Sequence, residues 1–156
     1  MIYFCVILKI IITIKGKAML ITDEYRRQHE EILELVNKLS GYLNEQKLKN
    51  DAQEARKILS KLSGALKVHL AMEDNSLYPR LLASNDDKIR KIAKQFIEEI
   101  GGIAPVFNNY LNKWPNPASI ESNPSEFINE TSDLFNALKN RIDRENNILY
   151  PLIDKT

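Results

Sequence analysis

The sequence predicts an all-α protein: an antiparallel four-helix bundle with up-down-up-down topology, built as an internal repeat of two helical hairpins. Four segments carry apolar residues at alternating steps of three and four, which is the spacing of one face of an amphipathic helix. The connections between the segments are mostly short, and short connections place consecutive helices antiparallel. A repeat relates the second segment to the fourth, so the bundle consists of two related hairpins.

The first segment runs from Thr22, a residue suited to cap a helix, to about residue 44. Its apolar face consists of Tyr25, His29, Ile32, Val36, Leu39 and Leu43. The second segment follows a polar loop and starts at Asp51, and its face consists of Ala55, Leu59, Leu62, Leu66, His69, Glu73 and Leu77. Pro79 disfavours helical geometry at Tyr78, so this helix is expected to end or kink there.

The third segment has a weak middle, because Gly101, Gly102 and Pro105 interrupt it. Its apolar face consists of Ile89, Ile92, Phe96, Glu99, Ile103, Val106 and Tyr110. The fourth segment starts at Asn123, which is followed by a proline at the first helical position. Its face consists of Phe127, Thr131, Leu134, Leu138, Arg141, Glu145 and Ile148. Each of the four faces therefore carries at least one ionisable residue.

The repeat places residues 66–79 on residues 138–151, a shift of 72 residues with seven of fourteen aligned positions identical. Both copies contain a glutamate, Glu73 in the first and Glu145 in the second, and both continue with Leu-Tyr-Pro. The histidine differs, because Arg141 occupies the place of His69. The second copy therefore keeps only half of the first copy's His-x-x-x-Glu pair.

Length and composition narrow the class of protein. A chain of 156 residues suits one domain with one core. Lys plus Arg number 22 against 21 Asp plus Glu, so no overall field draws nucleic acid or an anionic membrane, and neither partner is expected. The single cysteine, Cys5, excludes an internal disulfide and suits a reducing, cytoplasmic location.

Residues 1–18 form an apolar extension ahead of the bundle, which is expected to span residues 19–156. The apolar run is too short for a transmembrane helix, which needs about 20 residues. Its positive charges follow the apolar run, unlike those of a secretory signal. We expect either that translation begins at Met19 or that this extension is a loose or membrane-associating tail.

Burying an ionisable group costs several kcal/mol unless it is paired or coordinated, so the ionisable residues of the four faces are expected to converge. Imidazole nitrogen and carboxylate oxygen suit iron, manganese or zinc, and helical bundles hold metals between facing helices. The candidate metal ligands are His29, His69, Glu73, Glu99 and Glu145. Alternatives remain open: His29 is a core histidine, Arg141 holds Glu145 in a salt bridge, or Glu98 faces inward in place of Glu99. Tyrosines on the apolar faces can donate to the cluster or simply pack, namely Tyr25, Tyr78, Tyr110 and Tyr150.

At these motifs, residues 22–151 resemble a hemerythrin-like (HHE cation-binding) domain. The resemblance rests on a histidine early in the first helix, His-x-x-x-Glu with Leu-Tyr-Pro after it in the second, and the related copy in the fourth. It implies a four-helix bundle with a non-haem di-iron centre that binds dioxygen or serves oxygen, nitric oxide or iron sensing and storage. Ligand positions of the family match His29, His69, Glu73 and Glu145. The set is incomplete, because the helix-three histidine falls near Gly101 and the helix-four histidine is Arg141.

With Glu99 included, the predicted cluster contains three carboxylates and one guanidinium. If both histidines are neutral, these groups leave two negative charges, which are balanced by one divalent ion. A second ion would be repelled by Arg141, which stays protonated. The first hypothesis is therefore a mononuclear or degraded non-haem iron site used in sensing or metal handling, with manganese or zinc as alternatives and dioxygen or another diatomic molecule as ligand. The second is a metal-free interaction or regulatory domain held by an Arg–Glu–His core network, its protein partner unknown. A ferritin-like oxidase is less favoured, since the chain lacks Glu-x-x-His. No residue is assigned a catalytic role, and an enzyme is the less favoured class.

Overall fold

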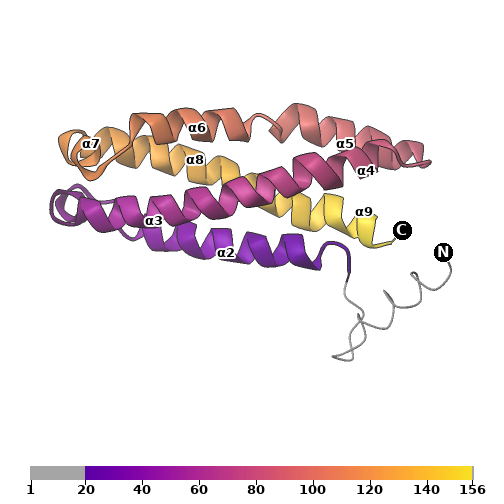
Figure 1. The fold of residues 1–156 in the computed structure, drawn as a ribbon, viewed down its shortest axis with the longest axis horizontal. Coiled ribbons are helices and arrows are strands. Elements are labelled where there is room, and N and C mark those ends of the chain that lie inside the picture. The colour runs from indigo at the N-terminus through magenta and orange to yellow at the C-terminus, as the bar shows by residue number, and fades with distance from the viewer. Residues whose placement is uncertain (1–19, 156) are drawn as a thin grey trace, which may run out of the picture.

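The computed structural model describes residues 20–155, and this part of the chain is helical without any strand. Four long arms run alternately in opposite directions, so the predicted all-α, up-down-up-down bundle is confirmed (Figure 1). The expectations for residues 1–18, Met19 and Cys5 lie outside the described residues. Among residues 20–155, no helix has the length and apolar character that a bilayer-crossing segment requires.

The first hairpin consists of two arms. The first arm is α2 (Asp23–Ser40), and the second is α3 (Glu45–Met72), which continues through a short π-helix, η1 (Glu73–Leu77), into α4 (Tyr78–Leu82). Helices α2 and α3 lie side by side along much of their length (Figure 1).

The second hairpin repeats this plan with one more break. Its first arm is α5 (Asp87–Ile100) followed by α6 (Ile103–Lys113), and the break at Gly101 and Gly102 confirms the predicted weakness there. The short helix α7 (Pro117–Ser122) closes one end of the bundle. The second arm is α8 (Pro124–Arg144), η2 (Glu145–Leu149) and α9 (Tyr150–Asp154).

The starts of the helices differ in part from the sequence prediction. Thr22 precedes α2, but its hydroxyl donates to Asp154 of α9 at 2.6 Å instead of capping the helix. The second arm begins earlier than predicted, because the side chain of Asn44 accepts hydrogen bonds from two backbone N–H groups of the first turn. Asp51, the predicted cap, lies inside α3 at a kink with φ −125° and ψ 25°.

The prediction that Pro79 disfavours helical geometry at Tyr78 and ends the helix there is wrong, because the chain stays helical through a π turn. The wider turn removes the conflict between the proline ring and the carbonyl four residues before it. Tyr78 has helical angles (φ −64°, ψ −43°), and its N–H bonds to the carbonyl of Glu73, five residues earlier. In the second copy, Tyr150 bonds in the same way to Glu145. The repeat therefore extends to the backbone.

Two apolar residues predicted to lie on buried faces are exposed. Beyond Gly101 and Gly102, Phe107 is buried in place of the predicted Val106, which is 58% exposed. Within the η2 turn, Leu149 is buried and the predicted Ile148 is 46% exposed. In both places the buried residue lies four positions after the preceding buried residue of the face, Ile103 or Glu145, where the prediction counted three.

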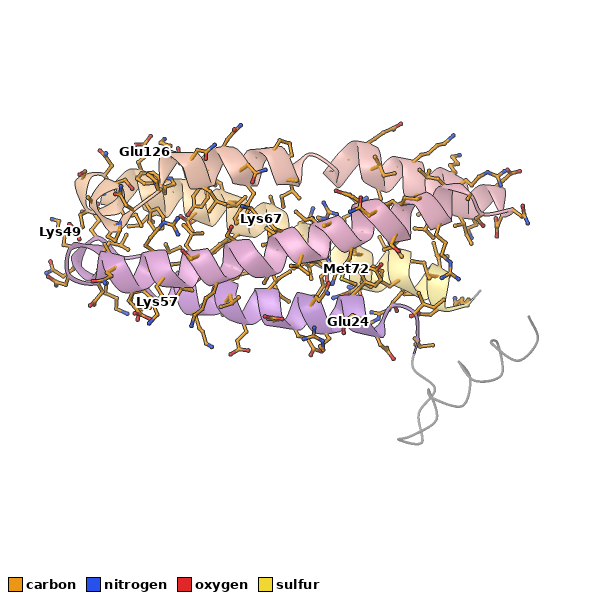
Figure 2. All side chains as sticks on the ribbon, in the orientation of Figure 1. Glu24, Lys49, Lys57, Lys67, Met72 and Glu126 are labelled. Atoms are coloured by element: carbon orange, nitrogen blue, oxygen red, sulfur yellow. The ribbon has the colours of Figure 1, made fainter. Side chains whose placement is uncertain are left out.

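The apolar core divides into two clusters. The larger cluster lies toward α7 and includes Ile32, Leu66, Leu70, Leu138 and Ile142. The smaller one lies at the other end and includes Tyr25, Leu77, Leu149 and Tyr150. Charged side chains cover the outside, as Figure 2 shows for Lys49, Lys57, Lys67 and Glu126. On the first, second and fourth arms, the buried residues His29, Glu73 and Glu145 each lie between residues of the larger cluster and residues of the smaller one.

Candidate metal centre

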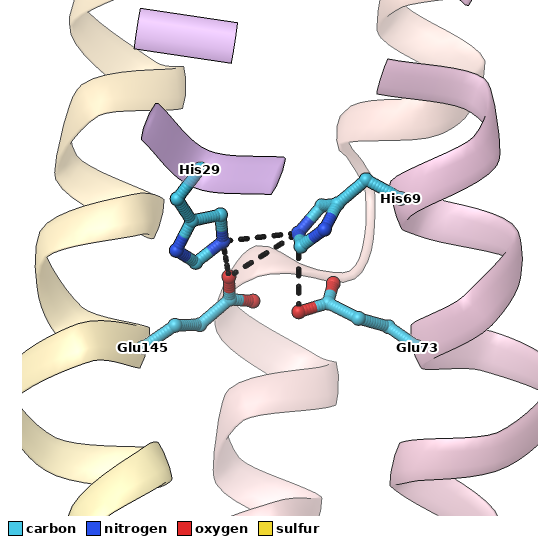
Figure 3. Close-up of side chains that lie close together, drawn as sticks. All are labelled: His29, His69, Glu73 and Glu145. Carbon is cyan, nitrogen blue, oxygen red and sulfur yellow. Dashed lines mark hydrogen bonds and ion pairs between the residues drawn. The ribbon is translucent and has the colours of Figure 1, made fainter. Parts of the chain in front are cut away.

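Four buried side chains meet where the two apolar clusters adjoin. His29 comes from α2, His69 from the last turn of α3, and Glu73 and Glu145 are the first residues of η1 and η2. None is more than 2% exposed. One ligand atom from each lies within 4.8 Å of all the others (Figure 3). The structure thus brings together four of the five predicted ligands, whose metal-binding role stays a prediction.

The converging atoms are two imidazole nitrogens and two carboxylate oxygens (Figure 3). His29 Nε2 lies 3.0 Å from His69 Nε2 and 3.1 Å from Glu145 Oε2. His69 Nε2 lies 3.3 Å from Glu73 Oε1, one helical turn further along the same arm. All four atoms therefore face one small volume.

The outer nitrogen of each histidine is held by an amide oxygen. His29 Nδ1 lies 2.8 Å from Asn146 Oδ1, and His69 Nδ1 lies 2.9 Å from Gln28 Oε1. The orientation of the Gln28 amide follows from its nitrogen, which donates to a Glu24 oxygen at 3.3 Å. Because an amide oxygen only accepts, each Nδ1 carries the hydrogen and each Nε2 presents a lone pair to the centre. This tautomer is the one that ligates a metal through Nε2.

Arg141 lies on the other side of the two carboxylates. Its Nη2 donates to Glu73 Oε2 at 2.6 Å, and its Nε donates to Glu145 Oε1 at 2.9 Å. Burial opposes the charged form, but Glu145 and Glu73 more than compensate and raise the pKa of Arg141. The guanidinium therefore stays charged, and it donates to the carboxylate oxygens that face away from the histidines.

Two tyrosines complete the contacts of the carboxylates. Tyr150 donates to Glu73 Oε1 at 2.9 Å, and Tyr78 donates to Glu145 Oε1 at 3.3 Å. Burial and the nearby carboxylates raise the pKa of both hydroxyls well above the usual range, so both remain donors.

Glu145 Oε2 is fully buried and accepts no hydrogen bond within the described part of the chain. It faces the His29 lone pair, and two such atoms in contact need a cation or a proton between them.

The charge of the cluster is smaller than expected from the sequence. With neutral imidazoles, Glu73, Glu145 and Arg141 sum to one negative charge. When His69 carries a proton shared within the cluster, burial still raises the pKa of Glu73, but the hydrogen bond and charge of His69 and the charge of Arg141 outweigh burial and hold this pKa at about 2. One shared proton neutralises the group, while one divalent ion leaves a single positive charge. The donor set fits one cation, with space in the charge balance for one monovalent anion.

The prediction that Glu99 faces the interior is wrong. Its side chain is 42% exposed and forms an ion pair with Arg144 on the outside of the bundle. Glu99 lies three residues after the buried Phe96, in the last turn of α5 before the Gly101–Gly102 break. The alternative, Glu98, is exposed as well. Neither residue belongs to the group of convergent ligand atoms.

Sequence reasoning missed Gln28 and Asn146, which orient the histidines. Each is the sequence neighbour of a ligand-type residue, so it lies about 100° round the helix from the face that the periodic pattern marks. The sequence feature that could have identified Gln28 and Asn146 is an amide side chain directly next to a candidate ligand. Of the four tyrosines considered, Tyr78 and Tyr150 reach the carboxylates, whereas Tyr110 bonds to Thr131 at 2.7 Å.

The fold and the buried His–Glu group define a helical-bundle module suited to hold a cation. The chain belongs to the hemerythrin family: the model of the hemerythrin HHE cation binding domain matches residues 20–153. The resemblance seen in the sequence is thereby confirmed, and the buried His–Glu group gives this chain a set of residues suited to hold a metal ion. Neither the curated proteins nor the solved structures include a match to the chain.

Proposed function

We propose that this protein holds a single non-haem iron ion on His29, His69, Glu73 and Glu145 and uses it in sensing or metal handling. One observation carries the proposal: the two Nε2 lone pairs lie 3.0 Å apart beside two carboxylate oxygens, with both Nδ1 atoms committed to amide oxygens. Such a buried arrangement is unfavourable without a positive charge at its middle.

Each residue has a defined task in this function. The histidines and glutamates supply two nitrogen and two oxygen ligands, a set that suits iron and also manganese or zinc. Gln28 and Asn146 hold the imidazole rings and their tautomers, and Tyr150 and Arg141 orient the carboxylates. A bound iron ion supplies affinity for a diatomic ligand such as dioxygen. The surrounding apolar clusters keep water from the ligands.

Metal content measured on purified protein tests this function. Protein reconstituted without oxygen with iron(II), then desalted, should retain metal, and His69→Ala and Glu73→Gln should lose it. Glu99→Gln is the matched control, because Glu99 is an exposed glutamate outside the cluster, and it should retain metal like the wild type. A wild-type protein that keeps no iron, manganese or zinc contradicts the proposal.

A metal-free interaction module is the second candidate, and the position of Arg141 favours it. The guanidinium bridges both carboxylates, and one proton shared between the two Nε2 atoms completes the neutralisation. In that case the reconstituted wild type is metal-free, and its unfolding temperature is unchanged by iron, manganese or zinc. The same preparation therefore distinguishes the two functions.

A further inference from the structure

Each of the two carboxylates of the centre faces the histidine pair with one oxygen and Arg141 with the other. Their inner oxygens, Glu73 Oε1 and Glu145 Oε2, face the histidine pair. Their outer oxygens, Glu73 Oε2 and Glu145 Oε1, both face Arg141 at 2.6 and 2.9 Å. A carboxylate that bridges two cations uses one oxygen for each. We call the place between Glu73 Oε2 and Glu145 Oε1 the outer position; here it is occupied by the guanidinium of Arg141.

The repeat shows what Arg141 replaces. In the first copy, His69 contacts Glu73 four residues later, Nε2 to Oε1, at 3.3 Å. In the second copy, Arg141 contacts Glu145 four residues later, Nε to Oε1, at 2.9 Å. The same helical contact is kept, but the side chain brings a permanent positive charge where the first copy brings a neutral nitrogen ligand.

The second hairpin also lacks the counterpart of His29. The shift of 72 residues carries His29 to Gly101. A Cβ added at Gly101 would come within 2.3 Å of the backbone oxygen of Ile97, so this backbone accepts no side chain there. The outer position is therefore left with carboxylate oxygens and Arg141, and without either nitrogen ligand of the first hairpin.

We propose that Arg141 is the built-in second cation of this centre: its guanidinium occupies the outer position, so the chain assembles the carboxylates without a metal there and takes one ion only, between the histidines. The count of one ion rests on the proposed function. The role of Arg141 as a cation surrogate does not, because it concerns the carboxylates in the metal-free protein.

Arg141, which closes the outer position, borders a cavity. The cavity has a volume of about 700 Å³, lies between α6 and α8, and is also lined by Gly102, Ile103, Tyr110 and Leu134. A cation added to an Arg141 variant therefore has a route to the outer carboxylate oxygens, which makes replacement of the guanidinium by a metal ion testable.

The first test is metal stoichiometry in the full chain, reconstituted with excess iron(II) without oxygen. The wild type should hold one ion, and Arg141→Lys, which keeps the positive charge, should also hold one. Arg141→His removes the permanent charge and offers a nitrogen ligand, so it should hold two. A wild type with two ions, or an Arg141→His protein with no more than the wild type, overturns the proposal.

The second test is thermal unfolding. The unfolding temperature measures how much Arg141 stabilises the carboxylates, even if the histidine pair binds no metal. In chelator, Arg141→Met should unfold at a temperature lower than the wild type by on the order of 10 °C. Added manganese(II) should raise the unfolding temperature of Arg141→Met more than that of the wild type, because the ion replaces the lost charge. If Arg141→Met folds only with manganese, the proposal is supported. An unchanged unfolding temperature in chelator, or a failure to fold with or without manganese, overturns it.

Discussion

In the first hairpin, α2 and α3 bring both histidines of the chain to the centre, whereas α5, α6 and α8 of the second hairpin bring an arginine and no histidine. The two halves nevertheless share a backbone. Each has a π turn of five residues that opens with a buried glutamate and is followed by Tyr-Pro. The halves thus agree in how they place a carboxylate and differ in what surrounds it.

This difference shows that the π turn and the nitrogen ligands of the metal site depend on different residues. Because the turn occurs in both halves, it does not require a histidine one turn earlier. It follows from the proline, which lacks an N–H and forces the carbonyl four residues before it to find other geometry. The turn sets the positions of Glu73 and Glu145, and the residue four positions before each supplies a nitrogen ligand in the first half, His69, and a fixed positive charge in the second, Arg141.

The largest expected effect comes from removing the cation of the second half. Arg141→Ala in chelator should lower the free energy of unfolding by about 3–5 kcal/mol, because two buried carboxylates lose their shared partner. Urea unfolding measures this. Arg144→Ala, one turn along the same arm and in a partly exposed ion pair with Glu99, is the control and should cost at most about 1 kcal/mol. Equal effects of the two substitutions would contradict the assigned role of Arg141.

The carboxylate of the first half should control stability in acid. The fold lowers the pKa of Glu73 from its ordinary value of 4.5 to about 2, so Glu73 is ionised in the native state at pH values where the unfolded chain is protonated. The stabilisation is present above pH 4.5 and is lost as the pH falls through 2. It amounts to about 3 kcal/mol, an order-of-magnitude figure. Unfolding measured in chelator from pH 6 to 2 should show this loss, and Glu73→Gln should flatten the acid side; an unflattened curve would assign it to other groups.

The amide residues should affect metal binding more than folding. Gln28→Leu removes the acceptor of His69 Nδ1–H, and Asn146→Leu removes that of His29. Each should weaken metal affinity by about 10–100-fold, as loss of a partner that orients a ligand typically does. Competition with a chromogenic chelator measures the affinity. Gln95→Leu, on the exposed side of α5, should leave it unchanged, and a similar loss in this control would refute the orienting role.

The smallest effects concern two glycines, one in each half. Gly101→Ala should destabilise the fold by at least about 1 kcal/mol, because its Cβ meets the Ile97 oxygen. Gly64→Ala, in the interior of α3, has no atom within 4 Å of its Cβ and should stabilise by about 0.5–1 kcal/mol through helix propensity. Thermal unfolding of the two variants should show opposite signs, and the same sign in both would mean that the third arm adjusts at Gly101.

Much of the fold follows from local pattern. The spacing of Leu59, Leu62 and Leu66 marks a buried face over several turns, and all three are fully or almost fully buried. The same counting placed His29 and His69 inside, because both lie on uninterrupted α-helix. It misplaced Val106 and Ile148 by one position each, because the neighbouring Phe107 and Leu149 are the buried residues, and it placed the exposed Glu99 inside. Periodicity marks a face, but it does not decide whether the next buried position lies three or four residues further on.

By itself, the sequence determined the class of fold, the two-hairpin repeat and the loss of a histidine at Arg141, because helical periodicity and the repeat follow from the order of residues along the chain. It also named the four convergent residues, but together with Glu99, which lies outside the centre. The tertiary structure decided the rest. Which carboxylate oxygen meets Arg141 and which meets a histidine depends on how α3 and α8 face each other across the core. The hydrogen bonds from His29 to Asn146 and from His69 to Gln28 join residues 117 and 41 positions apart, a distance in sequence that no local pattern spans.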